Sequence, residues 1–340
     1  MRIVVTGGAG FIGSHVCEAL AKRGDDVSCF DNFSDYYVQL AGSRFAERKQ
    51  RNIQEVQAAL AKEGKSIVVK HVDFTIPDSV YGAFNAFGDD VDAVIHLGAL
   101  AGVRTQYTRE DYFKTNHKGT HTVLEAAWWT TNTKRFVIAS SSSVYGTNEK
   151  VPFSEDDGIS VSRMKAPYAE SKHKVEEMCQ EYCVHNPGAS IALLRFFTVY
   201  GPRGRPDMAP YKFVDALHQG KPISRFGDGD KTARDYTYIE DIVAGILAAL
   251  DTMPNLQPCE IFNLGNSSPV TLNQFIKTVE DVTGKKAVIN DEPANQADVP
   301  ITYADVSKAE RLLRWKPTTN IKEGLKKFYD WYLKSPESSS

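Results

Sequence analysis

Several features that define other classes of protein are scarce or missing in this sequence. Only five of its 340 residues are cysteines, and that odd number does not suit a disulfide framework. No apolar run approaches the ~18 residues of a membrane span, no block of about five like charges occurs, and the net charge is −3. The opening residues, MRIVVTGGAG, do not resemble a secretory signal. We therefore expect a cytoplasmic protein with reduced thiols that binds neither membranes nor nucleic acid.

The cysteines also give no sign of a metal centre. Cys179 and Cys183 are four residues apart, which puts them on one face of an expected helix. A zinc site needs further cysteine or histidine ligands close by. We interpret these two residues as packing sulfurs and expect no bound metal.

Short apolar segments alternate with stretches of helical character over the first 196 residues. The expected strands cover residues 3–7, 27–31, 66–74, 92–99, 135–140 and 190–196, and the expected helices cover 13–23, 44–63, 112–130 and 168–185. The strands are apolar continuously rather than at every second residue, as in parallel strands covered on both faces. This alternation predicts an α/β protein with a doubly wound parallel sheet.

The pattern loosens after residue 197, where glycine and proline gather. An amphipathic helix is expected from about 239 to 250, followed by a short buried strand at 261–265. We predict a large domain of residues 1–196 plus about 231–266. A smaller C-terminal α/β lobe for the substrate is predicted to take about 197–230 plus 267–333, with a frayed tail at 334–340.

The stretch VVTGGAGFIGSH places Gly7, Gly10 and Gly13 between a strand and a helix. Such a loop allows a tight turn, a close approach of the backbone to a pyrophosphate, and exposure of a helix N-terminus to an anion. Asp31 ends the second expected strand, where a carboxylate accepts hydrogen bonds from a ribose and repels a 2′-phosphate. We predict a Rossmann domain that binds NAD. Asp73, at the end of the third strand, is either an adenine ligand or a strand-end cap.

Tyr168 and Lys172, in PYAESK, are spaced to share one face of a helix. An ammonium and a cationic nicotinamide would together lower the pKa of the tyrosine from about 10 toward neutrality, which makes it a general base for a sugar hydroxyl. Four consecutive serines, Ser140–Ser143, end the preceding strand. We expect these hydroxyls to line a sugar pocket.

Taken together, these segments resemble the extended short-chain dehydrogenase/reductase family of nucleotide-sugar enzymes over nearly the whole chain. The matching pieces are TGGAGFIG, DNFSDYY, HLGALAGVR, NHKGT, SSSSVYG, YAESK, RFFTVYGPRGRPDM and ARDYTYIEDI. The resemblance implies that Tyr168 is the base, that Lys172 supports it and binds the nicotinamide ribose, and that Ser141 holds the reacting O4. Further cofactor contacts are expected from the same motifs, at Phe11, Ile12, Asn32, Leu97, Ala99 and Asn116.

The resemblance also implies a site for a UDP-sugar. Arg234 is expected to bind its pyrophosphate, Ser224 and Phe226 are expected near its base, and Asp298 is a further candidate contact. Related dehydratases and decarboxylases carry acidic residues where this chain has Ser142 and Ser143. Elimination and decarboxylation therefore lack their catalysts, and 4-epimerisation is favoured.

Within the family, DNFSDYY and PRGRPDMA are most similar to the UDP-glucuronate 4-epimerases, although Gly98 stands where that subgroup usually has alanine. Arg205 is the candidate cation for the glucuronate carboxylate, and Ser142, Ser143 and Thr198 are the candidate hydroxyls. Arg205 is equally compatible with a surface loop or a phosphate ligand. The alternatives are a UDP-glucose/UDP-galactose 4-epimerase, then a dehydratase or decarboxylase, then a catalytically silent NAD-binding regulator.

Members of this family commonly dimerise through two helices of each subunit. The matching segments here are 112–130 and 168–185, which contain the apolar residues Leu124, Trp128, Val175 and Met178. The resemblance therefore implies a homodimer. An intramolecular core role for these residues is equally compatible with the sequence.

Overall fold

The core of the molecule is a seven-stranded sheet whose strands all run parallel. In spatial order the strands are β10 (Cys259–Leu264), β6 (Ser190–Phe196), β5 (Arg135–Ser141), β4 (Ala93–His96), β1 (Arg2–Thr6), β2 (Asp26–Asp31) and β3 (Val68–His71). The computed structural model describes residues 1–88, 91–102, 107–293 and 299–339. The strand order reverses between β1 and β4, which creates the crevice where doubly wound sheets bind ligands. The predicted strands are confirmed.

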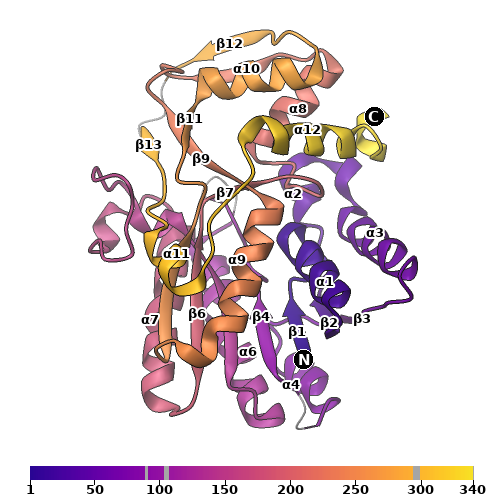
Figure 1. Ribbon diagram of the computed structural model, residues 1–340, viewed down its shortest axis with the longest axis vertical. Coiled ribbons are helices and arrows are strands. Elements are labelled where there is room, and N and C mark those ends of the chain that lie inside the picture. Colours follow the sequence, from indigo (N-terminus) through magenta and orange to yellow (C-terminus); the bar gives the residue numbers. More distant parts are fainter. Residues whose placement is uncertain (89–90, 103–106, 294–298, 340) are drawn as a thin grey trace.

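Helices cover both faces of this sheet (Figure 1). One face carries α1 (Phe11–Arg23), α3 (Arg48–Ala61) and α9 (Ile239–Thr252), and the other carries α4 (Pro77–Asn85), α6 (Gly119–Thr131) and α7 (Pro167–His185). Along β1, Ile3 and Val5 belong to the first core, whereas Val4 belongs to the second. Because both faces are buried, the strands read as continuous apolar runs. The predicted doubly wound α/β fold is therefore confirmed.

Two of the predicted helices are more broken than expected. The segment predicted at 112–130 starts as α5 (Arg109–Tyr112), continues as a π-helical turn, η2 (Phe113–Lys118), and only then becomes α6. The segment predicted at 44–63 starts with a 3₁₀ turn, η1 (Ser43–Phe45), before α3. A short helix, α2 (Tyr36–Ala41), precedes it. π-Helical turns occur often at functional sites, and η2 contains Asn116.

A smaller layer lies beyond the carboxyl ends of the sheet, at the top of Figure 1. Its helices are α8 (Ala209–Gln219), α10 (Leu272–Thr283) and α12 (Ile321–Tyr332), and α11 (Ser307–Leu313) packs beside β10 and α9. The strand β9 (Ala233–Tyr238) pairs with β7 (Thr198–Tyr200), β11 (Pro269–Thr271) and β13 (Ile301–Thr302), while β8 (Ile223–Phe226) pairs with β12 (Ile289–Glu292). The domain bounds 1–196 plus about 231–266 stay a prediction. The return of the chain to the large sheet is marked by α9 and β10, since β9 pairs in the smaller layer.

Among the described residues, no helix is both long and apolar enough to cross a membrane. Cys179 and Cys183 belong to α7, and both are buried where this helix packs on the sheet, as expected of packing residues.

In the segment expected as a frayed tail at 334–340, the last described residues dock onto α3. A 3₁₀ turn, η6 (Pro336–Ser339), buries the side chain of Glu337, which is 1% exposed. Its carboxylate lies 2.6 Å from Arg48 Nη1 and also binds Arg51. The Arg48 guanidinium lies over the ring of Trp331 at 4.7 Å and is itself only 2% exposed. The hydrophilic composition of the tail concealed this anchor, because a buried ion pair leaves no apolar pattern.

We expect Glu337→Gln to lower the free energy of unfolding by about 3 kcal/mol, because it leaves the buried charge of Arg48 without its partner. Burial raises the pKa of Glu337, but the charges of Arg48 and Arg51 outweigh it and hold this pKa below its usual value. The stabilisation should therefore be present above pH ~4 and be lost as the pH falls. Chemical denaturation at pH 7 and over a series of pH values below ~4 measures both effects.

The matched control is Asp330→Asn, which breaks the exposed i,i+4 pair with Lys326. Its effect should stay below about 0.5 kcal/mol. Equal effects of the two substitutions would show that the tail does not anchor α3.

Candidate functional site

A cavity of about 890 Å³ opens at the carboxyl ends of the central strands, between the large sheet and the smaller layer. Its walls come from the loops after β1, β2, β4, β5 and β6 and from residues up to Thr302. This is the crevice at the strand-order reversal. Of the residues predicted for the site, the cavity is lined by Gly7, Gly10, Phe11, Ile12, Gly13, Asp31, Asn32, Asp73, Leu97, Ala99, Ser141, Ser142, Ser143, Tyr168, Lys172, Thr198, Arg205 and Arg234.

The loop that contains Gly7, Gly10 and Gly13 forms a concave surface, which side chains at these positions would fill. Gly7 has φ +68°, and its N–H donates to Phe30 O at 2.8 Å. A Cβ on Gly13 would lie 2.1 Å from Gly7 O. Gly10 is the N-cap of α1 and has no side chain to cap the helix. The positive end of the helix therefore faces the cavity, which suits the pyrophosphate of a dinucleotide.

Acidic and amide side chains gather at one end of the cavity, at the ends of β2 and β3. Asp31 accepts hydrogen bonds from Ala9 N at 3.1 Å and Phe33 N at 2.8 Å. Lys49 Nζ lies 3.0 Å from its Oδ1 and reaches in from α3. Asn32 Nδ2 donates to Asp73 at 3.1 Å. This end suits an adenosine, as predicted, whereas Lys49 was missed because its position on a distant helix carries no local motif.

Asp73 has the capping role that the sequence allowed, whereas its contact with adenine stays a prediction. Its Oδ1 accepts from Thr75 N and Thr75 Oγ1, so it caps the turn after β3, and its side chain also faces the cavity. Burial raises the pKa of Asp73, but the hydrogen bonds from Thr75 and Asn32 outweigh it and lower this pKa below the usual value. The carboxylate is therefore available as an acceptor at neutral pH.

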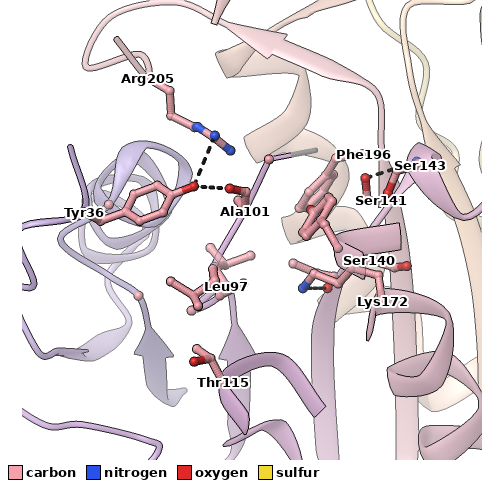
Figure 2. Close-up of a pocket in the computed structure, with 18 of the residues that line it drawn as sticks. Tyr36, Leu97, Ala101, Thr115, Ser140, Ser141, Ser143, Lys172, Phe196 and Arg205 are labelled. Atoms are coloured by element: carbon pink, nitrogen blue, oxygen red, sulfur yellow. Dashed lines mark hydrogen bonds between the residues drawn. The ribbon is translucent and has the colours of Figure 1, made fainter. Parts of the chain in front are cut away.

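Tyr168, Lys172 and Ser141 lie together at the other end of the cavity. Lys172 Nζ donates to Ala139 O at 2.8 Å, which fixes the ammonium at the end of β5 (Figure 2). Burial lowers the pKa of Lys172 to about 8. Burial also raises the pKa of Tyr168, and the hydrogen bond to Ser141 and the charge of Arg205 only partly oppose this. The expected near-neutral tyrosine is therefore absent from the protein alone, because the phenol is buried.

The four serines have two different surroundings. Ser140 donates from Oγ to Glu176 at 2.6 Å, so its hydroxyl serves a buried ion pair in the core. Ser141 Oγ accepts from Ser143 N at 3.2 Å, as Figure 2 shows. The Ser143 hydroxyl oxygen is buried and has no hydrogen-bond partner among the described residues. A hydroxyl left this way beside a cavity is suited to a ligand.

Arg205 reaches the cavity but is already paired. Its Nε and Nη2 bind both oxygens of Asp207, at 3.0 and 2.6 Å. Its Nη2 also lies 3.4 Å from the hydroxyl of Tyr36, which in turn binds Ala101 O (Figure 2). The predicted cation is therefore present at the site as a nearly neutral ion pair.

Three of the predicted contact residues are not among the described residues that line the cavity. Ser224 and Phe226 are on β8, whose partner is β12, and neither is among the residues that line the cavity. Asn116 also lies behind the wall: its amide binds both Leu100 N and Leu100 O at 2.9 Å. It therefore holds the loop after β4 rather than facing the cavity. Asp298 lies outside the described residues.

Gly98, which stands where the UDP-glucuronate 4-epimerases usually have alanine, is required here for a steric reason. A Cβ at this position would lie 2.4 Å from Cε1 of the Phe74 ring. Gly98 is also the residue against which Gly7 packs, since a Cβ on Gly7 would lie 2.6 Å from Gly98 N. An alanine here would displace either the ring or the glycine loop.

The geometry agrees with what comparison with known proteins finds. Residues 3–265 match the NAD dependent epimerase/dehydratase family. The chain is 41% identical to UDP-glucuronate 4-epimerase 4 of Arabidopsis thaliana, over 98% of this chain and 75% of that protein. It is 39% identical to a UDP-glucuronate 4-epimerase of Thermodesulfobacterium geofontis, over 96% and 95% of the two chains. The crystal structure of UDP-glucuronic acid 4-epimerase from Bacillus cereus with UDP-glucuronic acid and NAD superposes with a TM-score of 0.84 at 34% identity, covering 98% and 99% of the chains.

We expect Gly13→Ala to weaken NAD binding at least tenfold, because its Cβ would collide with Gly7 O and push the loop into the pyrophosphate site. Gly82→Ala is the matched control, since a Cβ there meets nothing within 4 Å. NAD affinity is measured by calorimetry on protein stripped of cofactor. Unchanged NAD affinity in Gly13→Ala would contradict this assignment of the loop.

Proposed function

The chain belongs to the NAD dependent epimerase/dehydratase family, and we propose that it interconverts UDP-glucuronate and UDP-galacturonate by inverting C4 of the sugar. One observation carries the reaction type. Tyr168, Lys172 and Ser141 lie together beside the glycine-loop cavity, while Ser142 and Ser143 provide hydroxyls where elimination or decarboxylation needs acids. The relatives of about 40% identity over nearly the whole chain support the choice of sugar.

The cavity fits NAD as the resident cofactor. The glycine cradle and the N-terminus of α1 suit its pyrophosphate, and Asp31 suits the adenosine ribose. Lys172 is the proposed ligand of the nicotinamide ribose. When bound, NAD supplies the hydride acceptor and donor for C4.

Tyr168 takes the proton of O4 as C4 is oxidised and returns it as C4 is reduced. Ser141 donates a hydrogen bond to O4 throughout. Lys172 has a pKa of about 8, so it is mostly protonated at pH 7 and stabilises the phenolate. Burial alone raises the pKa of Tyr168, so the positive charge that arrives with the oxidised cofactor is needed to make it a base. Proton removal by Tyr168 would therefore depend on NAD being bound to the enzyme in its oxidised form.

Between the two half-reactions the 4-keto sugar has to turn over and present its other face. Arg234, on β9 in the smaller layer, is the proposed anchor of the pyrophosphate during this turn. The nucleotide remains a fixed handle, and its binding energy supports a step at the sugar.

The carboxylate of the sugar needs protection while C4 is a ketone, because a β-keto acid loses CO₂ readily. We propose that Ser142, Ser143 and Thr198 hold it in an orientation that prevents this loss. The unpartnered hydroxyl of Ser143 supports the proposal, and Arg205 is the nearby cation. Neutral hydroxyls supply no acid that would protonate C5.

One observation favours a second candidate, a 4-epimerase of UDP-glucose and UDP-galactose. Asp207 occupies Nε and Nη2 of Arg205, so this ion pair offers little net charge to a carboxylate. A neutral sugar would be compatible with that pairing.

Proton NMR of the purified protein with UDP-glucuronate, without added NAD, tests the proposal. We expect a UDP-galacturonate anomeric signal to grow, without UDP-xylose or a stable 4-keto product. Conversion of UDP-glucose instead would keep the reaction and change the substrate. Absence of turnover on either sugar nucleotide would contradict the proposed reaction.

Two variants sharpen this experiment. Tyr168→Phe should reduce turnover at least 10³-fold, because it removes the acid–base group. Ser142→Ala combined with Ser143→Ala should slow epimerisation and release CO₂ as a side product. If that double variant matches the wild type in both respects, the serines do not hold the carboxylate.

We also propose that the enzyme acts as a homodimer in the cytoplasm. Trp128 on α6 packs edge-on against Tyr182 on α7, with ring centroids 6.1 Å apart, so the two helices are neighbours. Trp129 and Val184, on the same helices, are 68% and 75% exposed. Trp129 and Val184 are the large apolar side chains that these two helices expose, whereas Leu124, Val175 and Met178 are buried in the core of the subunit. A second copy of the same pair of helices is the proposed partner.

Val184→Glu should convert the dimer to a monomer, because it places a charge in this apolar surface. Val288→Glu is the control, since Val288 is 58% exposed in the smaller layer. Light scattering coupled to size-exclusion chromatography measures the mass. A monomeric wild type, or a Val184→Glu protein that stays dimeric, would exclude this interface.

A further inference from the structure

The acidic residues that line the cavity gather along one part of its wall, where Lys49 and Lys114 accompany them, and a second group of cations lies along another part. The acidic ones are Asp31, Asp35, Asp73 and Asp111, which come from the loops after β2 and β3 and from α5. On the side of Tyr168 and the serines, the lining residues with charge are the cations Arg163, Lys165, Lys172, Arg205 and Arg234. A trianionic sugar nucleotide would therefore meet positive charge where its sugar and pyrophosphate lie.

These cations differ in how many hydrogen bonds and ion pairs they already make within the protein. Arg205 is bound at two of its nitrogens by Asp207, and Arg234 donates from Nη1 to Ala233 O and Pro300 O. For Arg163 and Lys165, by contrast, no side-chain hydrogen bond or ion pair occurs within residues 1–88, 91–102, 107–293 and 299–339. Both are exposed in the open cavity, so their charge is available to a ligand.

The backbone holds these two residues against the serine turn, which is the 3₁₀ turn η3 (Ser142–Tyr145) that follows β5. Gly146, at the end of that turn, has φ +59°, and a Cβ there would lie 2.4 Å from Arg163 O. Thr147 N donates to the same carbonyl at 3.0 Å. Lys165 precedes Ala166, the N-cap of α7, and is three residues before Tyr168. The two cations are therefore attached to the two structures that carry the proposed catalytic groups.

We propose that Arg163 and Lys165 form the subsite that recognises the C6 carboxylate of the sugar and selects a charged over a neutral substrate. The inference rests on the proposed function and extends it to residues outside the predicted site. A carboxylate is bonded to C5, next to the reacting C4, so a group that binds it has to lie near Tyr168 and the serines. Arg163 and Lys165 meet this condition. A carboxylate would provide the ion-pair partner that these two side chains lack among the described residues.

The test compares Arg163→Met and Lys165→Met, which keep much of the side-chain length and remove the charge. We expect each to raise the KM for UDP-glucuronate about tenfold and to weaken the dependence of that KM on salt. The KM or Kd for UDP-glucose and the Kd for UDP should stay within twofold of the wild type. Lys165→Arg should restore most of the affinity, which a purely structural role of the lysine would not predict.

Lys150→Met is the matched control. Lys150 belongs to the same segment between the serine turn and α7, but it pairs with Asp157 and does not line the cavity. Its KM for UDP-glucuronate should not change. Thermal unfolding and NAD content verify that every variant is folded and loaded.

Two results would overturn the inference. One is a KM for UDP-glucuronate within twofold of the wild type in both Met variants. The other is an equal loss of affinity for UDP alone, which would assign the cations to the diphosphate. If the wild type turns over only UDP-glucose, the proposed function fails. Calorimetry with UDP-glucuronate as a ligand then still tests the subsite, since the Met variants should lose affinity for it.

Discussion

A buried ion pair between Glu176 and Arg195 holds the catalytic end of the molecule together. Both side chains are 3% exposed, and two of the guanidinium nitrogens bind the carboxylate at 2.8 and 2.9 Å. The same carboxylate accepts the hydroxyl of Ser140, and Arg195 Nη1 reaches Tyr145 at 2.9 Å. The helix α7, which carries Tyr168 and Lys172, the proposed catalytic residues, is thereby attached to β5, to β6 and to the serine turn. Removing one partner would leave a buried charge, so the alignment of these elements is strongly enforced.

The second constraint is steric and applies at the cofactor end. Gly7 packs on Gly98, Gly98 packs on the Phe74 ring, and Gly13 packs on Gly7 O, each without room for a Cβ. These contacts bring β1, α1 and the end of β4 closer together than side chains would permit. The cavity floor is therefore made of backbone, whose N–H groups and helix dipole suit a pyrophosphate.

Electrostatics divide the same cavity into two ends. At the adenosine end, Asp31 is paired with Lys49 and is bound by backbone N–H groups. At the sugar end, Arg205 is paired with Asp207, while Arg163 and Lys165 are available to a ligand. A cation that is already paired with a carboxylate of the protein has little net charge left for a ligand, but its hydrogen bonds can still orient that ligand. An unpaired cation also attracts an anionic ligand by its charge. This difference is the physical basis for separating the placement of the sugar from the recognition of its carboxylate.

Local sequence was sufficient for the parallel strands and for the residues Asp31, Tyr168 and Lys172, which line the same cavity as the glycine loop. Each depends on short-range spacing or on continuous burial, which a linear sequence records directly. Ser224 and Phe226 lie on β8 and are not among the described residues that line the cavity, so their contact with the nucleobase stays a prediction. The pairing of Arg205 with Asp207, the reach of Lys49 to Asp31 and the buried anchor of Glu337 required the folded chain. Ion pairs and burial are set by which side chains meet in space, and the folded chain brings Glu337 to Arg48 across almost its whole length.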